Sequence, residues 1–369
     1  MDTPLSPNDD PDLLDLMMQD MGAADPQYRP GNYWEVYARR FLPELKNVGL
    51  RDFRRRRGSV VHSFAGTDLV HPVVWFDQDR LRFINNRYFR RIPGWPGLMG
   101  RLAKCVEAGI RTTSYCSQDA RKALISALCR SMAAEVPNAK PLSDFSMSLI
   151  GNPEEVFDID GKKYSTQFFE NYLHYVYVSR FLNLDTVQVV AELGAGMGRQ
   201  IELLRKLHPH LSFYIFDIAP QLYVSERYLS SVFPGSVTSY RETREWTRLP
   251  DPEPGRIYFL GSWKMPLLEQ RPIDLFWSTD SFQEMEPESS ANYLRLASAS
   301  ARNVYLRQGA RGQSVAARPG AHGVMKATPF DHYRNCLAAF EEIDFRPNIT
   351  TDGTVDPDYC CAFWRRPNA

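Results

Sequence analysis

Val-Val-Ala-Glu-Leu-Gly-Ala-Gly-Met-Gly-Arg, residues 189–199, is the stretch that decides the fold of this chain. It joins a run of β-branched residues to a turn with three glycines, and a helical pattern follows over residues 200–207. A glycine turn between a strand and a helix lets the backbone approach a ligand closely, because no Cβ intervenes. Ligands of parallel α/β sheets bind at the carboxyl ends of the strands, so we expect a binding site at this turn.

Short apolar strands and amphipathic helices alternate on both sides of the turn. The predicted strands cover residues 187–192, 213–216, 257–260, 274–278 and 303–306, with a closing antiparallel pair at 343–349 and 359–365. The predicted helices cover residues 168–181, 200–207, 221–233, 289–301 and 331–341. Alternating strands and helices form a parallel sheet that is covered on both faces. Residues 141–369 are therefore predicted to form one α/β domain.

Three details of the turn favour S-adenosylmethionine over a dinucleotide as its ligand. Arg199 occupies the position where the dinucleotide fingerprint requires its third glycine. Glu192, at the end of the strand, would repel a pyrophosphate but not the ammonium or sulfonium of S-adenosylmethionine. Asp217 ends the next strand, where a carboxylate can accept both ribose hydroxyl protons in either kind of site. A turn that needs glycine only for packing, and a different nucleotide, are the alternatives.

The residues around the turn resemble known methyltransferases. Residues 191–198 (Ala-Glu-Leu-Gly-Ala-Gly-Met-Gly) look like motif I of the class I S-adenosylmethionine-dependent methyltransferases. Residues 216–220 and 277–285 are similar to the putative sugar O-methyltransferase family, which is found in polysaccharide and glycosylated natural-product pathways. The resemblance covers roughly residues 165–369. It implies a seven-stranded, Rossmann-like methyltransferase sheet whose last strand is antiparallel, with S-adenosyl-L-methionine as the cofactor.

The resemblance also implies roles for individual residues. Asp217 would hold the ribose of the cofactor. The three glycines of the turn, Gly194, Gly196 and Gly198, would lie against its methionine part. The adenine would lie near the residues that follow the third strand, which are Gly261, Ser262 and Trp263.

A hydroxyl acceptor needs a general base or a metal ion, because a protonated hydroxyl is a poor nucleophile. Asp280 and Glu284 follow the fourth strand, and a helical turn there would direct both toward one opening. They could act as base and orienting carboxylate, or ligate a divalent cation. The alternative is that they cap a helix or pair with an arginine. His322 and His332, in and after the predicted substrate loop at 308–330, are the other candidate bases.

The N-terminal residues 1–140 are predicted to form a mainly helical cap over the acceptor pocket, with the first 25 residues flexible apart from a short helix through Leu13, Leu14 and Met17. The segment 26–111 holds 17 basic and 7 acidic residues and includes the arginine run 54–57. We interpret this arginine run as a solvent-exposed face. The alternatives are that it binds a phosphorylated acceptor or RNA.

The composition is that of an ordinary globular protein. The chain has 369 residues, 43% of them hydrophobic, with 44 basic and 44 acidic side chains. The balanced charge argues against a dedicated nucleic-acid or membrane-surface protein. The six cysteines have no zinc-site spacing, and neither a secretory signal nor a membrane-spanning run is recognisable. These features indicate reduced thiols in a cytoplasmic protein.

The sequence therefore predicts an S-adenosylmethionine-dependent enzyme that methylates a hydroxyl of a small molecule, a sugar or a glycosylated natural product. Methylation of a nitrogen or carboxyl group of a small metabolite is one alternative. An RNA methyltransferase and a non-catalytic methyltransferase-like scaffold are the others. The sequence leaves open whether the chain forms a homo-oligomer.

Overall fold

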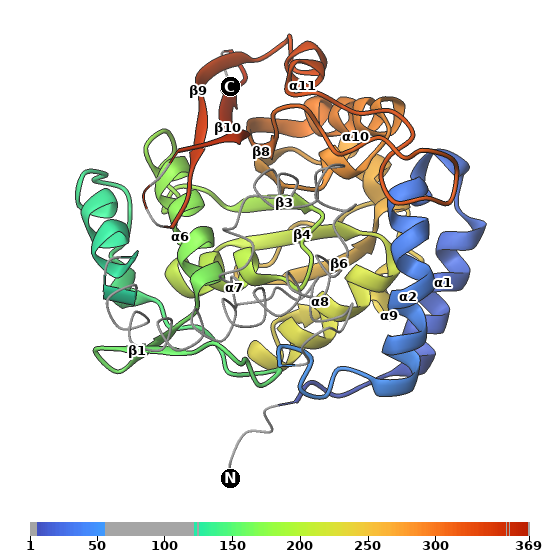
Figure 1. The fold of residues 1–369 in the computed structure, drawn as a ribbon, viewed down its shortest axis with the longest axis horizontal. Coiled ribbons are helices and arrows are strands. Elements are labelled where there is room, and N and C mark those ends of the chain that lie inside the picture. Colours follow the sequence, from blue (N-terminus) through green and yellow to red (C-terminus); the bar gives the residue numbers. More distant parts are fainter. Residues whose placement is uncertain (1–5, 56–121, 124, 352, 354, 368–369) are drawn as a thin grey trace, which may run out of the picture.

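The computed structural model describes residues 6–55, 122–123, 125–351, 353 and 355–367. Its centre is an eight-stranded sheet with the order β5-β6-β4-β3-β7-β8-β10-β9 (Figure 1). The pairs from β5 to β8 are parallel, and β10 runs antiparallel to both of its neighbours. The strands are β3 (Val189–Leu193), β4 (Ser212–Asp217), β5 (Val237–Thr238), β6 (Ile257–Gly261), β7 (Ile273–Thr279), β8 (Ala301–Gly309), β9 (Glu341–Ile349) and β10 (Val355–Arg365).

This topology confirms the Rossmann-like α/β sheet and the antiparallel last strand, but the strand number is eight rather than seven. The additional strand is β5, whose two residues pair with the start of β6 at the edge of the sheet. The chain forms this short strand as it returns to the sheet after a helix. Because β5 has only two residues, it contains no apolar run that a sequence pattern could reveal.

The hydrophobic core consists of two clusters, one on each face of the sheet, and successive side chains of a strand pack into different clusters. Val190, Phe213 and Ile215 point into one cluster, whereas Ala191 and Tyr214 point into the other. Successive side chains of a strand point to opposite faces, so a strand that is apolar throughout must be covered on both sides. The near-continuous apolar runs of β3 and β4 therefore require helices on both faces.

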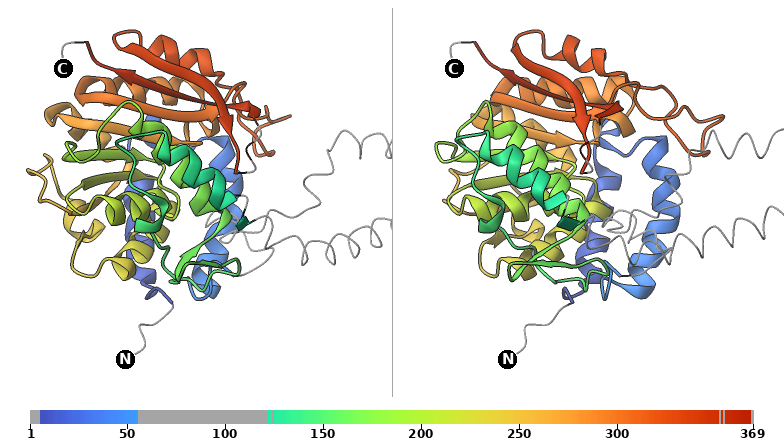
Figure 2. Two further views of the ribbon diagram at one scale, coloured as in Figure 1. Left: turned by 90° about the vertical axis from the view of Figure 1, so that its left-hand side faces the viewer. Right: turned by 60° about the vertical axis from the view of Figure 1, so that its left-hand side comes forward.

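Helices pack on both faces of the sheet (Figures 1 and 2). The first face carries α6 (Thr166–Ser179), α7 (Arg199–Leu207) and α8 (Ala219–Val232), whose apolar residues share one core cluster. The second face carries η5 (Ser262–Gln270), α10 (Pro287–Ser300) and α11 (Phe330–Cys336). The further elements are α9 (Tyr240–Thr243), the short turns η1 (Pro26–Tyr28), η4 (Leu142–Asp144) and η6 (Phe282–Glu284), and a two-stranded ribbon of β1 (Phe157–Ile159) and β2 (Lys162–Tyr164).

Two local predictions differ from the structure. The helix predicted over 331–341 ends with α11 at Cys336, because β9 already begins at Glu341 and pairs with β10. The arginine run was expected to be a solvated face, yet Arg54 is fully buried and donates to the carbonyls of Ser148 and Ile150. Residues 56 and 57, and most of the basic segment 26–111, lie outside the described residues.

A helix is present at the place where the sequence predicted a short one, around Leu13, Leu14 and Met17. This helix, α1 (Pro11–Ala23), is capped by Asp10, whose carboxylate accepts a hydrogen bond from the backbone N–H of Leu13, and it packs on α8. The buried side chains of this helix are Leu13, Leu14, Met17 and Met21. Helix α2 (Asn32–Val48) follows, and a further helix covers residues 125–134. The cap domain 1–140 and its boundary stay predictions. In the described residues, no helix is long and apolar enough to cross a membrane.

Candidate active site

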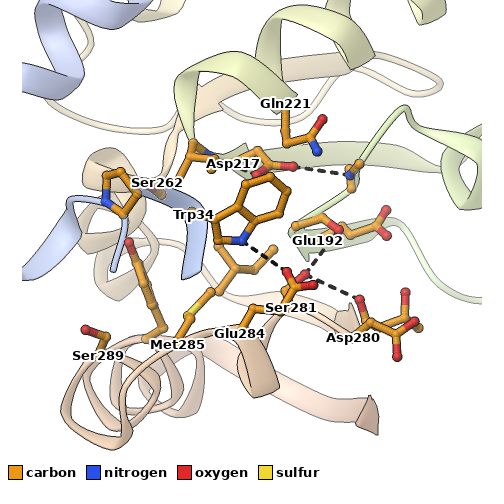
Figure 3. Close-up of a pocket in the computed structure, with 18 of the residues that line it drawn as sticks. Trp34, Glu192, Asp217, Gln221, Ser262, Asp280, Ser281, Glu284, Met285 and Ser289 are labelled. Carbon is orange, nitrogen blue, oxygen red and sulfur yellow. Dashed lines mark hydrogen bonds between the residues drawn. The ribbon is translucent and has the colours of Figure 1, made fainter. Parts of the chain in front are cut away.

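A cavity of about 300 Å³ lies at the carboxyl ends of β3, β4 and β7, where the sequence placed the binding site (Figure 3). Its volume is at the lower end of the range for small-molecule sites. Its wall is built from the segments 28–31, 192–196, 217–218, 279–281 and 284–286, together with Trp34, Asn171, Arg199, Gln200, Gln221, Ser262, Ser289 and Tyr293.

The glycine turn after β3 forms one side of this cavity. Gly194 has φ +80° and Gly196 has φ +58°, a left-handed backbone that non-glycine residues rarely adopt. A Cβ at Gly194 would stand only 1.7 Å from Oγ of Ser281, so this residue must be glycine for two independent reasons. Gly198 does not line the cavity. It caps α7, and a Cβ there would meet Leu229, so its role is helix packing.

Glu192 and Asp217 are the two carboxyl groups predicted to bind the cofactor, and both line the cavity. Asp217 accepts hydrogen bonds from the backbone N–H of Ile218 at 2.8 Å and of Gly196 at 3.2 Å. Burial raises the pKa of Glu192 to about 8, with a further contribution from the like charge of Asp217. Burial also raises the pKa of Asp217 to about 7, although its backbone hydrogen bonds oppose that shift. A cationic ligand would stabilise the ionised form of both groups.

These raised pKa values predict that the protein without ligand loses stability as the pH rises from about 5 to about 8. The unfolded chain releases the protons of Glu192 and Asp217 near pH 4, whereas the folded chain retains them to about pH 7–8. Between these limits the folded state binds more protons, so its free energy of unfolding falls with pH. Thermal unfolding at several pH values measures this effect. Glu192→Gln should flatten the dependence, and an equally steep curve in that variant would contradict the assignment.

Of the three residues expected near the adenine, one lines the cavity. Ser262 lines the cavity, and its hydroxyl donates to the carbonyl oxygen of Tyr28 at 3.4 Å. Gly261 and Trp263 do not line it. The Trp263 ring lies against Tyr240 instead, and the missing Cβ of Gly261 makes room for that ring. The aromatic rings that line this end come from Tyr28 and Tyr293, which pack against each other at 5.8 Å between centroids.

Asp280 lies at the end of β7 in the cavity wall, but an arginine already binds its carboxylate. Both carboxylate oxygens accept from Nη1 of Arg307, and Nη2 of Arg307 donates to Glu170 at 3.2 Å. Asp280 also has φ +66°, a strained backbone that the surrounding contacts must maintain. The arginine pairing that the sequence left open is therefore present.

Glu284 lines the same cavity and has no cationic partner among the described residues. Its Oε2 accepts from Nε1 of Trp34 at 3.0 Å, and the side chain of Tyr33 also interacts with this carboxyl group and lowers its pKa. Burial raises the pKa of Glu284 to about 8, and the nearby charge of Asp280 adds to this effect. A carboxylate with a pKa near neutrality is well matched to general-base catalysis.

The two predicted histidines lie outside the cavity wall. His322 is exposed, and its Nε2 is 3.0 Å from the hydroxyl of Tyr37 on α2. His332 lies on α11 with its Nε2 3.7 Å from Sγ of Cys336. The structure therefore brings the predicted carboxylates together at one cavity but leaves both histidines away from it.

The N-terminal segment, predicted to cover the acceptor pocket, contributes to this wall, but sequence reasoning named none of its residues as site residues. Tyr28, Arg29, Pro30, Gly31 and Trp34 all line the cavity. The aromatic residues of this segment were noticed only as part of a basic region. Arg307 was missed as well, although a basic residue at the carboxyl end of the fifth strand was a usable signal. No group of three or more metal-binding side chains occurs in the part of the chain that the structure describes.

No protein-family model and no curated protein matches the chain. The solved structures that it resembles include three with low identity and low structural similarity. The pyocyanin biosynthetic protein PhzM has 12% identity and a TM-score of 0.34, over 51% of this chain and 53% of PhzM. Magnesium protoporphyrin IX methyltransferase (ChlM) from Synechocystis PCC 6803 with bound SAM has 14% identity and a TM-score of 0.35, over 54% of this chain and 79% of ChlM.

The glycopeptide N-methyltransferase MtfA, complexed with S-adenosyl-L-methionine, has 12% identity and a TM-score of 0.38, over 54% of this chain and 94% of MtfA. The match thus spans about half the length of PhzM. Similarities of this size do not assign a function to the chain. Its function is inferred below from the residues of the cavity.

Proposed function

We propose that this protein is an S-adenosylmethionine-dependent methyltransferase that acts on a hydroxyl group of a small molecule. The observation that carries the proposal is the glycine turn between two buried carboxyl groups, Glu192 and Asp217, in one cavity with Glu284. The turn lets backbone approach a ligand, and the two carboxyl groups favour a ligand with positive charge.

The charge of the cavity wall supports this cofactor over a dinucleotide. Glu192 and Asp217 are both buried beside the glycine turn, which is where a dinucleotide would carry its pyrophosphate. Two carboxylates in a buried site would repel that group strongly. The cationic ammonium and sulfonium of S-adenosylmethionine would be attracted, and the remaining acceptor sites of Asp217 would suit the ribose hydroxyls.

The residues of this chain would bind the two reactants and remove one proton. When bound, S-adenosylmethionine supplies an electrophilic methyl carbon. Glu284, ionised, would accept the proton of the acceptor hydroxyl as the new oxygen–carbon bond forms and the carbon–sulfur bond breaks. Asp280, held by Arg307, would orient the acceptor. Holding the two reactants in line lowers the barrier, because the orientation is established on binding.

The proposed acceptor class has two separate sources of support. The sugar or glycosylated acceptor rests on the sequence resemblance alone, whereas the hydroxyl rests on Glu284. A small-molecule amine is the second candidate, because the carboxyl groups of the cavity would also attract a cationic acceptor.

Calorimetric titration of the protein with S-adenosylmethionine tests the cofactor directly. We expect binding in the micromolar range, with S-adenosylhomocysteine binding as well and NAD⁺ showing no heat. Transfer of an isotope-labelled methyl group to a panel of sugar hydroxyls, phenols and amines then identifies the acceptor. Binding of NAD⁺ in place of S-adenosylmethionine, or of neither, would reject the proposal. Methylation of amines alone would retain the cofactor and replace the acceptor class.

A further inference from the structure

Two neighbouring aromatic residues of α2 reach the carboxyl group of Glu284 from the N-terminal part of the chain. Nε1 of Trp34 donates to Glu284 Oε2 at 3.0 Å, across 250 residues of sequence. The side chain of Tyr33, the preceding residue, interacts electrostatically with the same carboxyl group. Figure 3 shows the Trp34 indole within the cavity, with its nitrogen directed at Glu284.

Contacts on both sides hold the start of α2 in place. The side-chain amide of Asn32 donates to the carbonyls of Ala321 at 2.9 Å and Gly323 at 2.7 Å, and its oxygen accepts from the backbone N–H of Gly320. Tyr28, just before the helix, packs on Tyr293 of α10. With its start anchored to two other segments, α2 presents Trp34 and Tyr33 to Glu284 from a fixed position.

Both side chains are neutral, so they act differently from an arginine partner. An indole N–H donates and cannot accept, so its bond to Oε2 favours the ionised carboxylate and fixes its orientation. Burial and the charges of Asp280 and Asp217 act in the opposite direction and raise the pKa of Glu284. The other charged groups in the cavity wall are Arg29, Glu192, Arg199 and Glu286.

We propose that Trp34 and Tyr33 are positioning residues, which favour the ionised form of Glu284 and keep its carboxylate directed at the acceptor. Arg307 neutralises the charge of Asp280, whereas Trp34 and Tyr33 are neutral. The carboxylate of Glu284 therefore stays available to accept the proton. The N-terminal helix α2 is then part of the catalytic centre rather than only a cover. This inference rests on the proposed function for its catalytic meaning, but its structural content can be tested without substrate.

The test measures the pKa of Glu284 in the protein without ligands. Glutamate labelled with ¹³C at the side-chain carboxyl is incorporated, and the resonance of Glu284 is identified by its loss in Glu284→Gln. Trp34→Phe retains an aromatic ring but loses the donor, and Tyr33→Phe loses only the hydroxyl. We expect each change to raise the pKa of Glu284 by about one unit, the size expected for a hydrogen bond to a charged group.

Trp246→Phe is the matched control for the tryptophan change, because Trp246 packs on Tyr258 outside the cavity. It should leave the pKa of Glu284 unchanged. An unchanged pKa in both Trp34→Phe and Tyr33→Phe would overturn the proposal, and Tyr33→Phe decides the matter if Trp34→Phe does not fold. Failure of the proposed function is separate, because it would appear as absent S-adenosylmethionine binding in the wild type.

With an acceptor available, the same variants have a kinetic signature. The acid limb of the pH profile of kcat should move to higher pH, and raising the pH should restore most of the lost activity. A lowered kcat with an unmoved pH profile would indicate a merely structural role.

Discussion

Replacing Glu284 by glutamine should lower turnover by about 10²- to 10⁴-fold, the range typical for loss of a general base. The variant keeps the size of the side chain and can still accept from Trp34, but it cannot take up a proton. Affinity for S-adenosylmethionine should change by less than about fivefold, because the cofactor carboxylates Glu192 and Asp217 are untouched. Rates of labelled methyl transfer and calorimetric titration measure the two quantities.

Glu288→Gln is the matched control, since Glu288 is a nearby exposed glutamate that pairs with Lys326 outside the cavity. It should behave like the wild type.

Asp280→Asn should lower turnover too, and it should also lower stability, because Arg307 would stay buried with Glu170 as its one remaining ionic partner among the described residues. Full activity in both the Glu284 and the Asp280 variants would move the base to His322 or His332, or remove the need for one.

Replacing Asp217 by asparagine should weaken binding of S-adenosylmethionine by tenfold or more. The change removes the negative charge and turns one acceptor into a donor, so the ribose loses hydrogen bonds to a charged group. The bond to the backbone N–H of Gly196, which supports the glycine turn, would also be weakened. Calorimetric titration measures the affinity, and thermal unfolding shows whether the variant is folded.

Asp274→Asn provides the comparison at the opposite end of the sheet. Asp274 accepts from the backbone N–H groups of Gln188 and Val189, so the same chemical change there alters a similar set of bonds away from the cavity. It should leave the cofactor affinity unchanged. An equal affinity in folded Asp217→Asn and wild type would reject the role of Asp217 in ribose binding.

Most of the α/β sheet was predictable because its signals are local. The strands β3, β4, β6, β7 and β8 are short apolar runs, and the helices between them have clear apolar faces. The two-residue β5 was missed because it has no periodicity of its own. A short helix was expected around Leu13, Leu14 and Met17, but the full extent of α1 depends on its packing on α8, which the local sequence does not reveal.

The cofactor end of the site was more predictable than the catalytic end. Glu192 and Asp217 lie at the ends of β3 and β4, and Gly194 and Gly196 follow β3, so the strand ends determine their place in the fold. The direction of a side chain beyond a strand end depends on its neighbours. Trp263 lies two residues after β6, and its ring packs on Tyr240 in the space left by the missing Cβ of Gly261.

Local sequence is enough to predict the strand, glycine turn and helix around residues 189–199, because apolar periodicity and left-handed backbone are properties of neighbouring residues. The pairing of Arg307 with Asp280 and of Trp34 with Glu284 becomes visible only in the folded molecule. The second pair is separated by 250 residues. No local pattern encodes such a contact, because it arises when the packing of whole helices and strands brings the two side chains together.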